Sequence, residues 1–374
     1  MILVFYSVVL NHHQAPLADE FFQKLGKDFV FVETTNLGDT KGAKEDYSRR
    51  PYLLRAWEND QCFQKALDMA QTADVCVFGG DDSMPYLKAR MEKGLLSFQI
   101  GERWLKRGWV NILSPRLQKF FFNYKVHGWS NKPLYKLCAS AFTASDDHKL
   151  DIYKGKHFKW GYFTTVENVK VSKEEVRLSF RIMWCARFLK LKHPELVILM
   201  AKQLKDEGYH FVVDMYGDGE VRQESESLVN DLQVDDVVKF HGNVPNSQVR
   251  EAMSSHDIFL FTSDKNEGWG AVLNESMSCG CVPVASDAIG SVPYLLQDGQ
   301  NGLIFESCHL NSLTDKVRHL LEHRQELLRL SRNAQTTMLE EWSPKCAAEH
   351  LLKLTDDLLH NRPCSIDHGP CSKA

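Results

Sequence analysis

The chain has 374 residues, of which 43% are hydrophobic and 25% are charged, as in soluble globular proteins. This length exceeds one ordinary hydrophobic core, so we expect two domains. The net charge of −4 gives no nucleic-acid signature, and no run approaches 18 apolar residues, which excludes a membrane span.

The first half alternates apolar runs with helical patterns. Its first ten residues lack the basic start and the cleavage site of a signal peptide, so we interpret them as a buried strand. The clearest helix covers residues 16–25, with a proline at its start. The predicted strands are residues 2–8, 29–33, 75–79, 95–100 and 141–144.

The second half is more regular. Short, continuously apolar runs separated by helices are typical of parallel strands covered on both faces. The predicted strands are residues 181–188, 211–217, 237–242, 257–263, 282–286 and 302–306. Two such halves predict an α/β protein of two Rossmann-like domains that face each other across a cleft.

The composition also predicts the domain limits. A polar, charged stretch at 167–175 separates an N-terminal domain, residues 1–166, from a C-terminal domain, residues 176–341. A helix at 342–360 follows, with Ser343 as N-cap and Pro344 in its first turn. The Pro/Gly/Ser-rich tail at 361–374 is expected to be disordered.

The stretch "NEGWGAVLNES" places Glu267 in a loop after a strand and Glu275 in the helix that follows. The amides of Ala271 and Val272 lie at the start of that helix, where the helix dipole favours an anion. Eight residues of helix rise about 12 Å, which is the scale of a nucleoside diphosphate sugar from ribose to hexose. The alternative is an acidic first turn on a solvated helix face.

The loop "CARFLKLKHPEL" follows the first strand of the second half. Arg187 and Lys192 stand at that strand end, before a helix that starts near Pro194. Two cations beside a helix start could hold a diphosphate. A solvated basic loop is the alternative.

These pieces together resemble the donor domain of retaining glycosyltransferase family 4, which has the two-domain GT-B fold. The resemblance covers residues 181–305 and also extends to the helix at "EWSP", which is similar to the last helix of the family. The matching pieces are "ARFLKLK", "MYGDGEVR", "VVKFHGNVP", the E-x7-E motif "NEGWGAVLNES", "CGCVPVASDAIGSVPYLL" and "DGQNGLIF".

The resemblance implies sugar transfer from a UDP- or GDP-linked donor with retention of anomeric configuration, and without metal or cofactor. The lack of any DxD sequence agrees with a metal-free reaction. Arg187 and Lys192 would stabilise the leaving diphosphate, Glu267 would contact the donor sugar, and Glu275 would bind ribose. The further donor-binding residues implied are Gly217, Gly242, Asn243, Gly268, Trp269, Gly270, Ala271 and Val272. Among them, Gly242 and Asn243 would line the base pocket, and Gly217 would permit close approach of the backbone.

Some positions depart from the family. His193 replaces the usual glycine after the lysine, and the glutamate usual after "VP" is absent at Tyr294. In the first loop of the chain, His12 and His13 replace a glycine-rich turn. Either histidine could contact the acceptor or the donor phosphate, or simply lie on the surface.

Residues 103–136 contain eight Lys/Arg and eight aromatic residues but no Asp or Glu. This mixture suits the surface of an anionic membrane or a lipid-diphosphate acceptor. The alternative is a basic, aromatic wall of the interdomain cleft. Glu102 and Arg103 precede this stretch and could orient an acceptor, or form ion pairs.

The sequence therefore predicts a bacterial hexosyltransferase that builds a cell-surface polysaccharide or glycolipid, in the cytoplasm at the inner face of the plasma membrane. Its expected partners are a nucleotide-sugar donor and a glycan or lipid-linked acceptor, with no nucleic acid. Two alternatives stay open. One is another GT-B enzyme, a nucleotide-sugar epimerase or a phosphorylase; the other is a non-catalytic nucleotide-sugar-binding partner protein.

Overall fold

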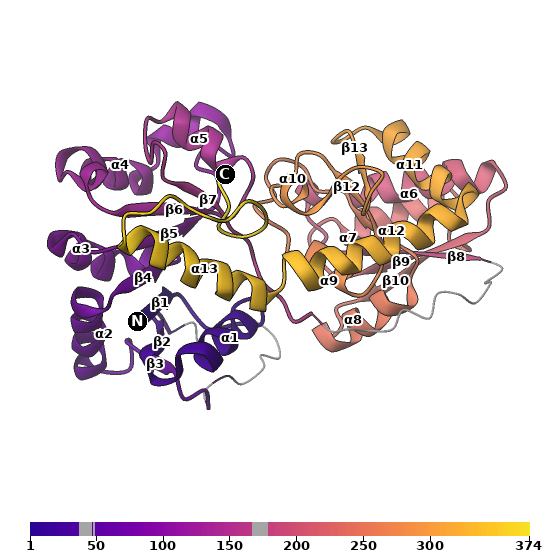
Figure 1. Cartoon of the computed structure of the whole chain (residues 1–374). Coiled ribbons are helices and arrows are strands. Elements are labelled where there is room, and N and C mark those ends of the chain that lie inside the picture. Colours follow the sequence, from indigo (N-terminus) through magenta and orange to yellow (C-terminus); the bar gives the residue numbers. More distant parts are fainter. Residues whose placement is uncertain (37–46, 48, 167–178) are drawn as a thin grey trace. The chain divides into compact units, whose positions relative to one another are not determined.

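The computed structural model describes residues 1–36, 47, 49–166 and 179–374. The chain forms two compact units (Figure 1). Met1–Thr165 and Ser343–Ala374 make the first unit, and Val166–Trp342 makes the second. The predicted polar join at 167–175 lies outside the described residues.

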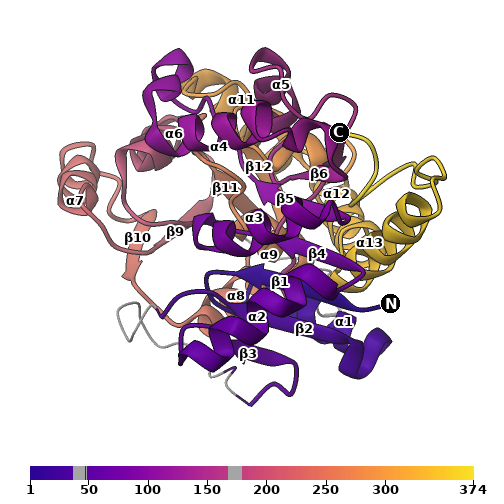
Figure 2. The same ribbon diagram turned by 90° about the vertical axis from the view of Figure 1, so that its left-hand side faces the viewer.

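The first unit is built on a seven-stranded parallel sheet with the order β3-β2-β1-β4-β5-β6-β7 (Figure 2). Its strands carry the buried apolar side chains that the sequence pattern predicted, and β1 is buried along its whole length. The strands are β1 (Leu3–Ser7), β2 (Phe29–Glu33), β3 (Leu53–Arg55), β4 (Val75–Phe78), β5 (Ser97–Gly101), β6 (Leu134–Cys138) and β7 (His157–Lys159).

Two helices of this unit start at a residue whose side chain caps them. The Asn59 side chain accepts a hydrogen bond from the amide of Cys62 at the start of α2, and Ser343 accepts one from Cys346 at the start of α13. The helix predicted at 342–360 is thus confirmed, and it packs on α1 through the ion pair Lys24–Glu349 at 2.8 Å. The helices are α1 (Ala15–Leu25), α2 (Asp60–Thr72), α3 (Met84–Lys93), α4 (Pro115–Phe121), α5 (Thr143–Lys149) and α13 (Pro344–Leu359).

The second unit holds a six-stranded parallel sheet with the order β10-β9-β8-β11-β12-β13. All six strands predicted for this half are present, and each contributes apolar side chains to the core of the unit. They are β8 (Phe180–Cys185), β9 (Phe211–Tyr216), β10 (Val238–Gly242), β11 (Ile258–Phe261), β12 (Val282–Ser286) and β13 (Leu303–Phe305). The helices are α6 (Pro194–Asp206), α7 (Arg222–Asp231), α8 (Asn246–Ser255), α9 (Val272–Ser278), α10 (Val292–Leu295), α11 (Leu310–Glu322) and α12 (Arg324–Thr336).

The strand predicted at 141–144 is wrong. Residues 140–142 form a bend and turn, and α5 begins at Thr143. The strand of this region is β6, seven residues earlier, where the polar Lys136 interrupts the apolar run and hides it from the pattern. The short strands β3 and β7 were missed, because three residues carry little periodic signal.

The disorder predicted for 361–374 is also wrong. Lys159, the last residue of β7, donates its amide to the carbonyl of Ser372 at 2.8 Å and accepts from the amide of Cys371 at 2.7 Å. The Cys371 side chain is fully buried. The segment is ordered because its backbone bonds to the edge strand, which composition alone does not reveal.

No helix within the described ranges combines the length and the apolar character that a bilayer span requires.

Candidate functional site

The predicted site residues of the second unit lie at or after the carboxyl ends of its strands, in the loops there and on α9. The loop after β8 carries Arg187 and Lys192, and the loop after β11 carries Glu267. β8 and β11 are direct neighbours in the sheet. Ligands of open parallel sheets bind at this edge.

Lys192 and Glu267 form an ion pair in this structure. Their side chains are only 13% and 14% exposed. Glu267 also accepts a hydrogen bond from the Ser263 hydroxyl at 3.0 Å, and the Thr262 hydroxyl donates to the carbonyl of Lys192 at 2.6 Å. The end of β11 therefore holds the loop after β8 and brings a cation and a carboxylate together.

Arg187 lies on the same loop but is exposed. In the parts of the chain that the structure describes, it makes no ion pair with Glu267 or with any other acid. Its backbone position depends on Gly217: a Cβ there would lie 1.9 Å from the carbonyl oxygen of Ala186. Gly217 thus permits the loops after β8 and β9 to touch, as the sequence predicted for close backbone approach.

The contacts of His193 explain why a residue other than glycine is tolerated at this position. Its φ is +49°, in the left-handed region that favours glycine. The ring compensates by contacting two acids, Glu195 at 2.7 Å and Asp264 at 3.5 Å. The hydrogen bond with Glu195 raises the pKa of His193, against the opposing effect of partial burial. A positive charge is therefore favoured beside Lys192.

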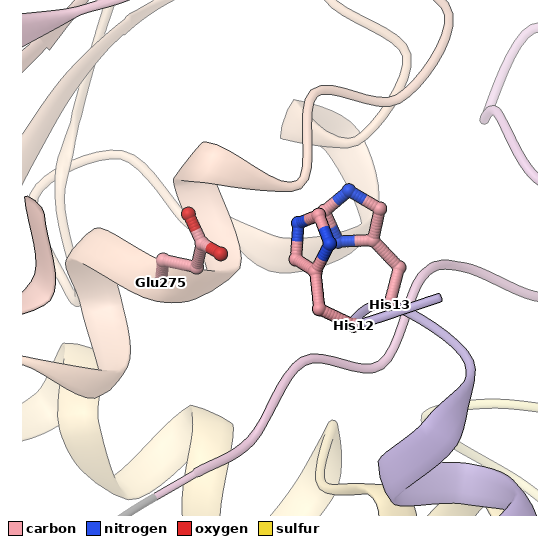
Figure 3. A group of neighbouring side chains, drawn as sticks. All are labelled: His12, His13 and Glu275. Carbon is pink, nitrogen blue, oxygen red and sulfur yellow. The ribbon is translucent and has the colours of Figure 1, made fainter. Parts of the chain in front are cut away.

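Glu275 lies on α9 and is buried, with only 5% exposure (Figure 3). Burial raises the pKa of its carboxyl group, while the amide of Asn246 at 3.1 Å and the charge of Arg250 oppose that shift. The alternative of a solvated helix face is wrong for this residue. A buried carboxylate with one amide partner keeps lone pairs for hydroxyl donors.

The turn between the two glutamates is fixed by packing. Gly270 has a φ of +80°, and a Cβ there would lie 2.2 Å from the Phe261 ring. Trp269 is 1% exposed, and its indole donates to Asn274 at 2.8 Å. The Trp269 side chain therefore supports the turn from inside, and it is the backbone from Gly268 to Val272, at the start of α9, that stays the predicted phosphate contact.

The predicted base-pocket residues end β10. The carbonyl of Gly242 accepts from the amide of Gly217 at 2.8 Å, which ties this strand end to the loop after β9. Gly242 has a φ of +70°, and Asn243 is exposed next to it. Their role with a base stays a prediction.

In the first unit, His12 and His13 lie side by side in the loop between β1 and α1, with ring centroids 3.7 Å apart (Figure 3). His13 also stacks on Tyr162 at 5.8 Å. Burial, and secondarily the neighbouring His12, lower the pKa of His13 to about 3, so this imidazole is neutral at physiological pH.

Glu102 and Arg103 are both engaged in ion pairs. Glu102 contacts Lys106 at 2.5 Å and accepts from the Tyr162 hydroxyl at 2.8 Å. Arg103 pairs with the buried Asp146 at 3.1 Å. The ion-pair alternative is correct for both residues, and both also line a cavity of this unit.

Two contacts of the site were not predicted from the sequence. Asn246 at the start of α8 contacts Glu275, and Ser263 at the end of β11 contacts Glu267. A polar residue directly after a parallel strand was the available signal for Ser263. Nothing in the local sequence of Asn246 indicates a partner 29 residues away.

Sequence and structure comparisons show which known proteins this chain resembles. The model of the family described as glycosyl transferases group 1 matches residues 169–337. That segment resembles the glycosyl transferases group 1 family. It contains each of the four residues Arg187, Lys192, Glu267 and Glu275.

Individual group 1 relatives are distant. The N-acetyl-alpha-D-glucosaminyl L-malate synthase of Bacillus anthracis is 30% identical over 115 residues, which are 31% of this chain and 29% of the relative. The lipopolysaccharide core biosynthesis glycosyltransferase LpsE of Rhizobium meliloti is 24% identical over 169 residues, 42% of this chain and 48% of the relative. The matches span less than half the length of either relative.

The fold of the whole chain has known counterparts. The structure of Anabaena HepE in complex with UDP has a TM-score of 0.68 at 14% identity, over 96% of this chain and all of HepE. Such a likeness at low identity shows the fold, which is GT-B: two parallel-sheet α/β units.

Proposed function

We propose that this protein is a retaining glycosyltransferase that moves a hexosyl unit from a nucleoside-diphosphate sugar to a glycan or lipid-linked acceptor of a cell-surface polysaccharide. The observation that carries the proposal is the Lys192–Glu267 pair at the carboxyl ends of two adjacent strands, inside the group 1 segment. The relatives named above, a glucosaminyl L-malate synthase and a lipopolysaccharide core transferase, support the reaction class and the pathway type.

In the proposed mechanism, four side chains bind different parts of the donor. Glu275 accepts the ribose hydroxyls, and Glu267 accepts hydroxyls of the transferred sugar. Lys192 and Arg187 stabilise the negative charge that develops on the leaving diphosphate, which is the most effective kind of transition-state stabilisation. When the diphosphate arrives, its oxygens replace Glu267 as partners of the Lys192 ammonium. These cations supply the charge for which other transferases use a divalent metal ion, so the reaction is proposed to need none.

The first unit is proposed to bind the acceptor. Within residues 103–136, five large apolar side chains are 54–72% exposed: Trp109, Val110, Leu113, Phe122 and Val126. Exposed apolar side chains next to lysines and arginines favour the surface of an anionic membrane. This feature supports a lipid-linked acceptor.

A thermal-shift panel tests the donor site. The full chain is heated with UDP-glucose, UDP-galactose, UDP-N-acetylglucosamine or GDP-mannose, in chelator and without added metal. A ligand at 100 times its dissociation constant stabilises the fold that binds it by about 2.7 kcal/mol. Glu275→Gln serves as the matched variant, because it keeps the shape of the side chain and removes the charge.

A shift with one nucleotide sugar that Glu275→Gln weakens is the expected result, and it identifies the donor. Stabilisation without any transfer to added acceptors would favour the non-catalytic partner protein. Conversion of the bound donor without acceptor would favour an epimerase. No stabilisation by any donor, by UDP or by GDP would contradict the proposal.

A further inference from the structure

The cavity that Glu102 and Arg103 line is formed by residues of the first unit. Its volume is about 480 Å³, in the range of pockets that take small molecules. It opens at the carboxyl ends of β4, β5 and β6, the edge at which parallel sheets bind ligands. Its lining includes Gly101, Glu102, Arg103, Trp104, Arg116 and Lys136.

The wall of this cavity is positively charged. Its lining includes the four cations Arg103, Lys106, Arg116 and Lys136 and the single carboxylate of Glu102. Asp146, which is outside the lining, offsets Arg103. Cations therefore outnumber carboxylates in the lining by four to one, and they face a concave space in which the field of charged walls is concentrated.

Lys136 is built into the wall. It stands in the middle of β6 with 1% exposure, and its ammonium lies 5.4 Å from the Trp104 ring centroid and 5.5 Å from that of Tyr153. The site has room for it because residue 101 is glycine: a Cβ there would lie 2.3 Å from the Lys136 nitrogen. Burying an ammonium is costly unless other groups compensate for the lost hydration, and the faces of these two aromatic rings contribute to that compensation.

Trp104 links the two cations that differ most in exposure. The Arg116 guanidinium, on the exposed face of α4, lies 5.2 Å from the same indole ring that Lys136 contacts. The Asn111 amide donates to the carbonyl of Trp104 at 2.8 Å and fixes the loop. The indole N–H of Trp104 is buried and has no acceptor within the described residues. It can therefore donate a hydrogen bond to a ligand oxygen or to an ordered water.

We propose that this cavity binds the anionic group of a phosphate- or carboxylate-bearing sugar or polyol, with Lys136 and Arg116 as its cations and Trp104 as the wall between them. The assignment of that anion to the acceptor rests on the proposed transferase function. Glu102, fixed by Lys106 and Tyr162, lies at the same wall and can accept a hydroxyl of the polyol.

Calorimetric titration of the full chain tests the proposal. The probes are glucose 6-phosphate and glucuronate, with glucose as the neutral match, all in saturating UDP so that the donor site is occupied. We expect both anions to bind and glucose to bind at least tenfold more weakly. Arg116→Gln should weaken the anions about tenfold, as expected for one charge-assisted hydrogen bond.

Two further variants make the result specific. Lys119→Gln removes a cation from the same exposed helix without touching the cavity, and it should leave the affinity unchanged. Gly101→Ala keeps every charge but displaces the Lys136 ammonium, and it should weaken the anions as Arg116→Gln does. Equal losses in Arg116→Gln and Lys119→Gln, or no binding of either anion, would overturn the proposal.

The same titration separates the possible sources of the anion. Displacement of glucose 6-phosphate by phosphatidylglycerol vesicles, and not by phosphatidylcholine vesicles, would support a lipid headgroup as the ligand. Retention against both kinds of vesicle would support a free anionic acceptor. UDP binding measured alone decides the proposed function independently: UDP binding without anion binding removes only the cavity proposal.

Discussion

The Lys192–Glu267 pair joins two residues that the sequence assigned to different parts of the donor. Both side chains are mostly shielded from water, so each charge depends on the other while no ligand is bound. The pair keeps the ammonium and the carboxylate oriented before the donor arrives. This preorganisation is a hypothesis that mutation of one or both partners can separate from a purely structural role.

Lys192→Met should reduce the rate of transfer by about 10²-fold or more, because one charge-stabilising group is lost. It should also lower the stability of the second unit, because the Glu267 carboxylate is left without its cation in a half-dry site. Steady-state rates and thermal unfolding measure the two effects. Lys190→Met, an exposed cation two residues earlier, is the control and should change neither.

The double variant Lys192→Met/Glu267→Gln removes both charges and should recover stability without recovering transfer. Recovery of both would mean that the pair only holds the loops together.

Glu275 allows a prediction about pH. Its pKa is raised in the folded protein, mainly by burial, so the folded state holds this proton more tightly than the unfolded chain does. The protonated carboxyl group contributes to the stability of the folded protein. This contribution is fully present below the unfolded pKa of about 4.3, and it is lost as pH rises through the raised pKa of the folded state. Near neutral pH, the buried charged carboxylate therefore lowers the stability of the folded protein.

Glu275→Gln should accordingly unfold at a higher temperature than the unmodified protein near pH 7, and the difference should shrink as pH falls toward 4. The same variant should bind the donor more weakly, because an amide offers one acceptor oxygen to the ribose hydroxyls instead of two. Asp231→Asn, an exposed acid at the end of α7, provides the control. A neutral-pH stability unchanged by Glu275→Gln would show that burial of this carboxylate has no energetic consequence.

At the scale of elements, the sequence predicts the second unit better than the first. Most of its six strands are short, nearly continuous apolar runs, so their positions follow from composition. The strand ends then place Glu267 and Lys192 in loops at one edge of the sheet. In the first unit, β6 contains Lys136, whose burial depends on aromatic partners from other segments. Contacts between loops, such as that of Lys192 with Glu267 75 residues away, form only in the folded chain and have no local signal.

The segment from Gly108 to Val126 forms an apolar, basic surface of the first unit. Trp109 and Leu113 are 60% and 72% exposed, and Arg107, Lys119 and Lys125 are exposed beside them in sequence. Trp109→Ser should weaken partitioning onto phosphatidylglycerol vesicles about tenfold, because an indole that enters the interface is lost. Sedimentation with vesicles measures it.

The matched control is Trp57→Ser, since Trp57 is exposed elsewhere in the same unit. High salt should weaken binding of both variants, because the lysines and arginines act through a screened field. Equal binding by Trp109→Ser and Trp57→Ser would favour the alternative, in which residues 103–136 form a wall of the interdomain cleft.

At the scale of the whole molecule, two units with separate cores predict two unfolding transitions. Because the donor-binding residues predicted in the second unit lie between Arg187 and Glu275, saturating UDP should raise only the transition of that unit. Leu260→Ala in β11 and Leu134→Ala in β6 are a matched pair of buried strand leucines. Each should destabilise its own unit by about 2–5 kcal/mol, and only Leu260→Ala should lower the UDP-sensitive transition in calorimetry. A single transition lowered by both variants would mean that the two units unfold as one, so that a ligand of either unit stabilises the entire chain.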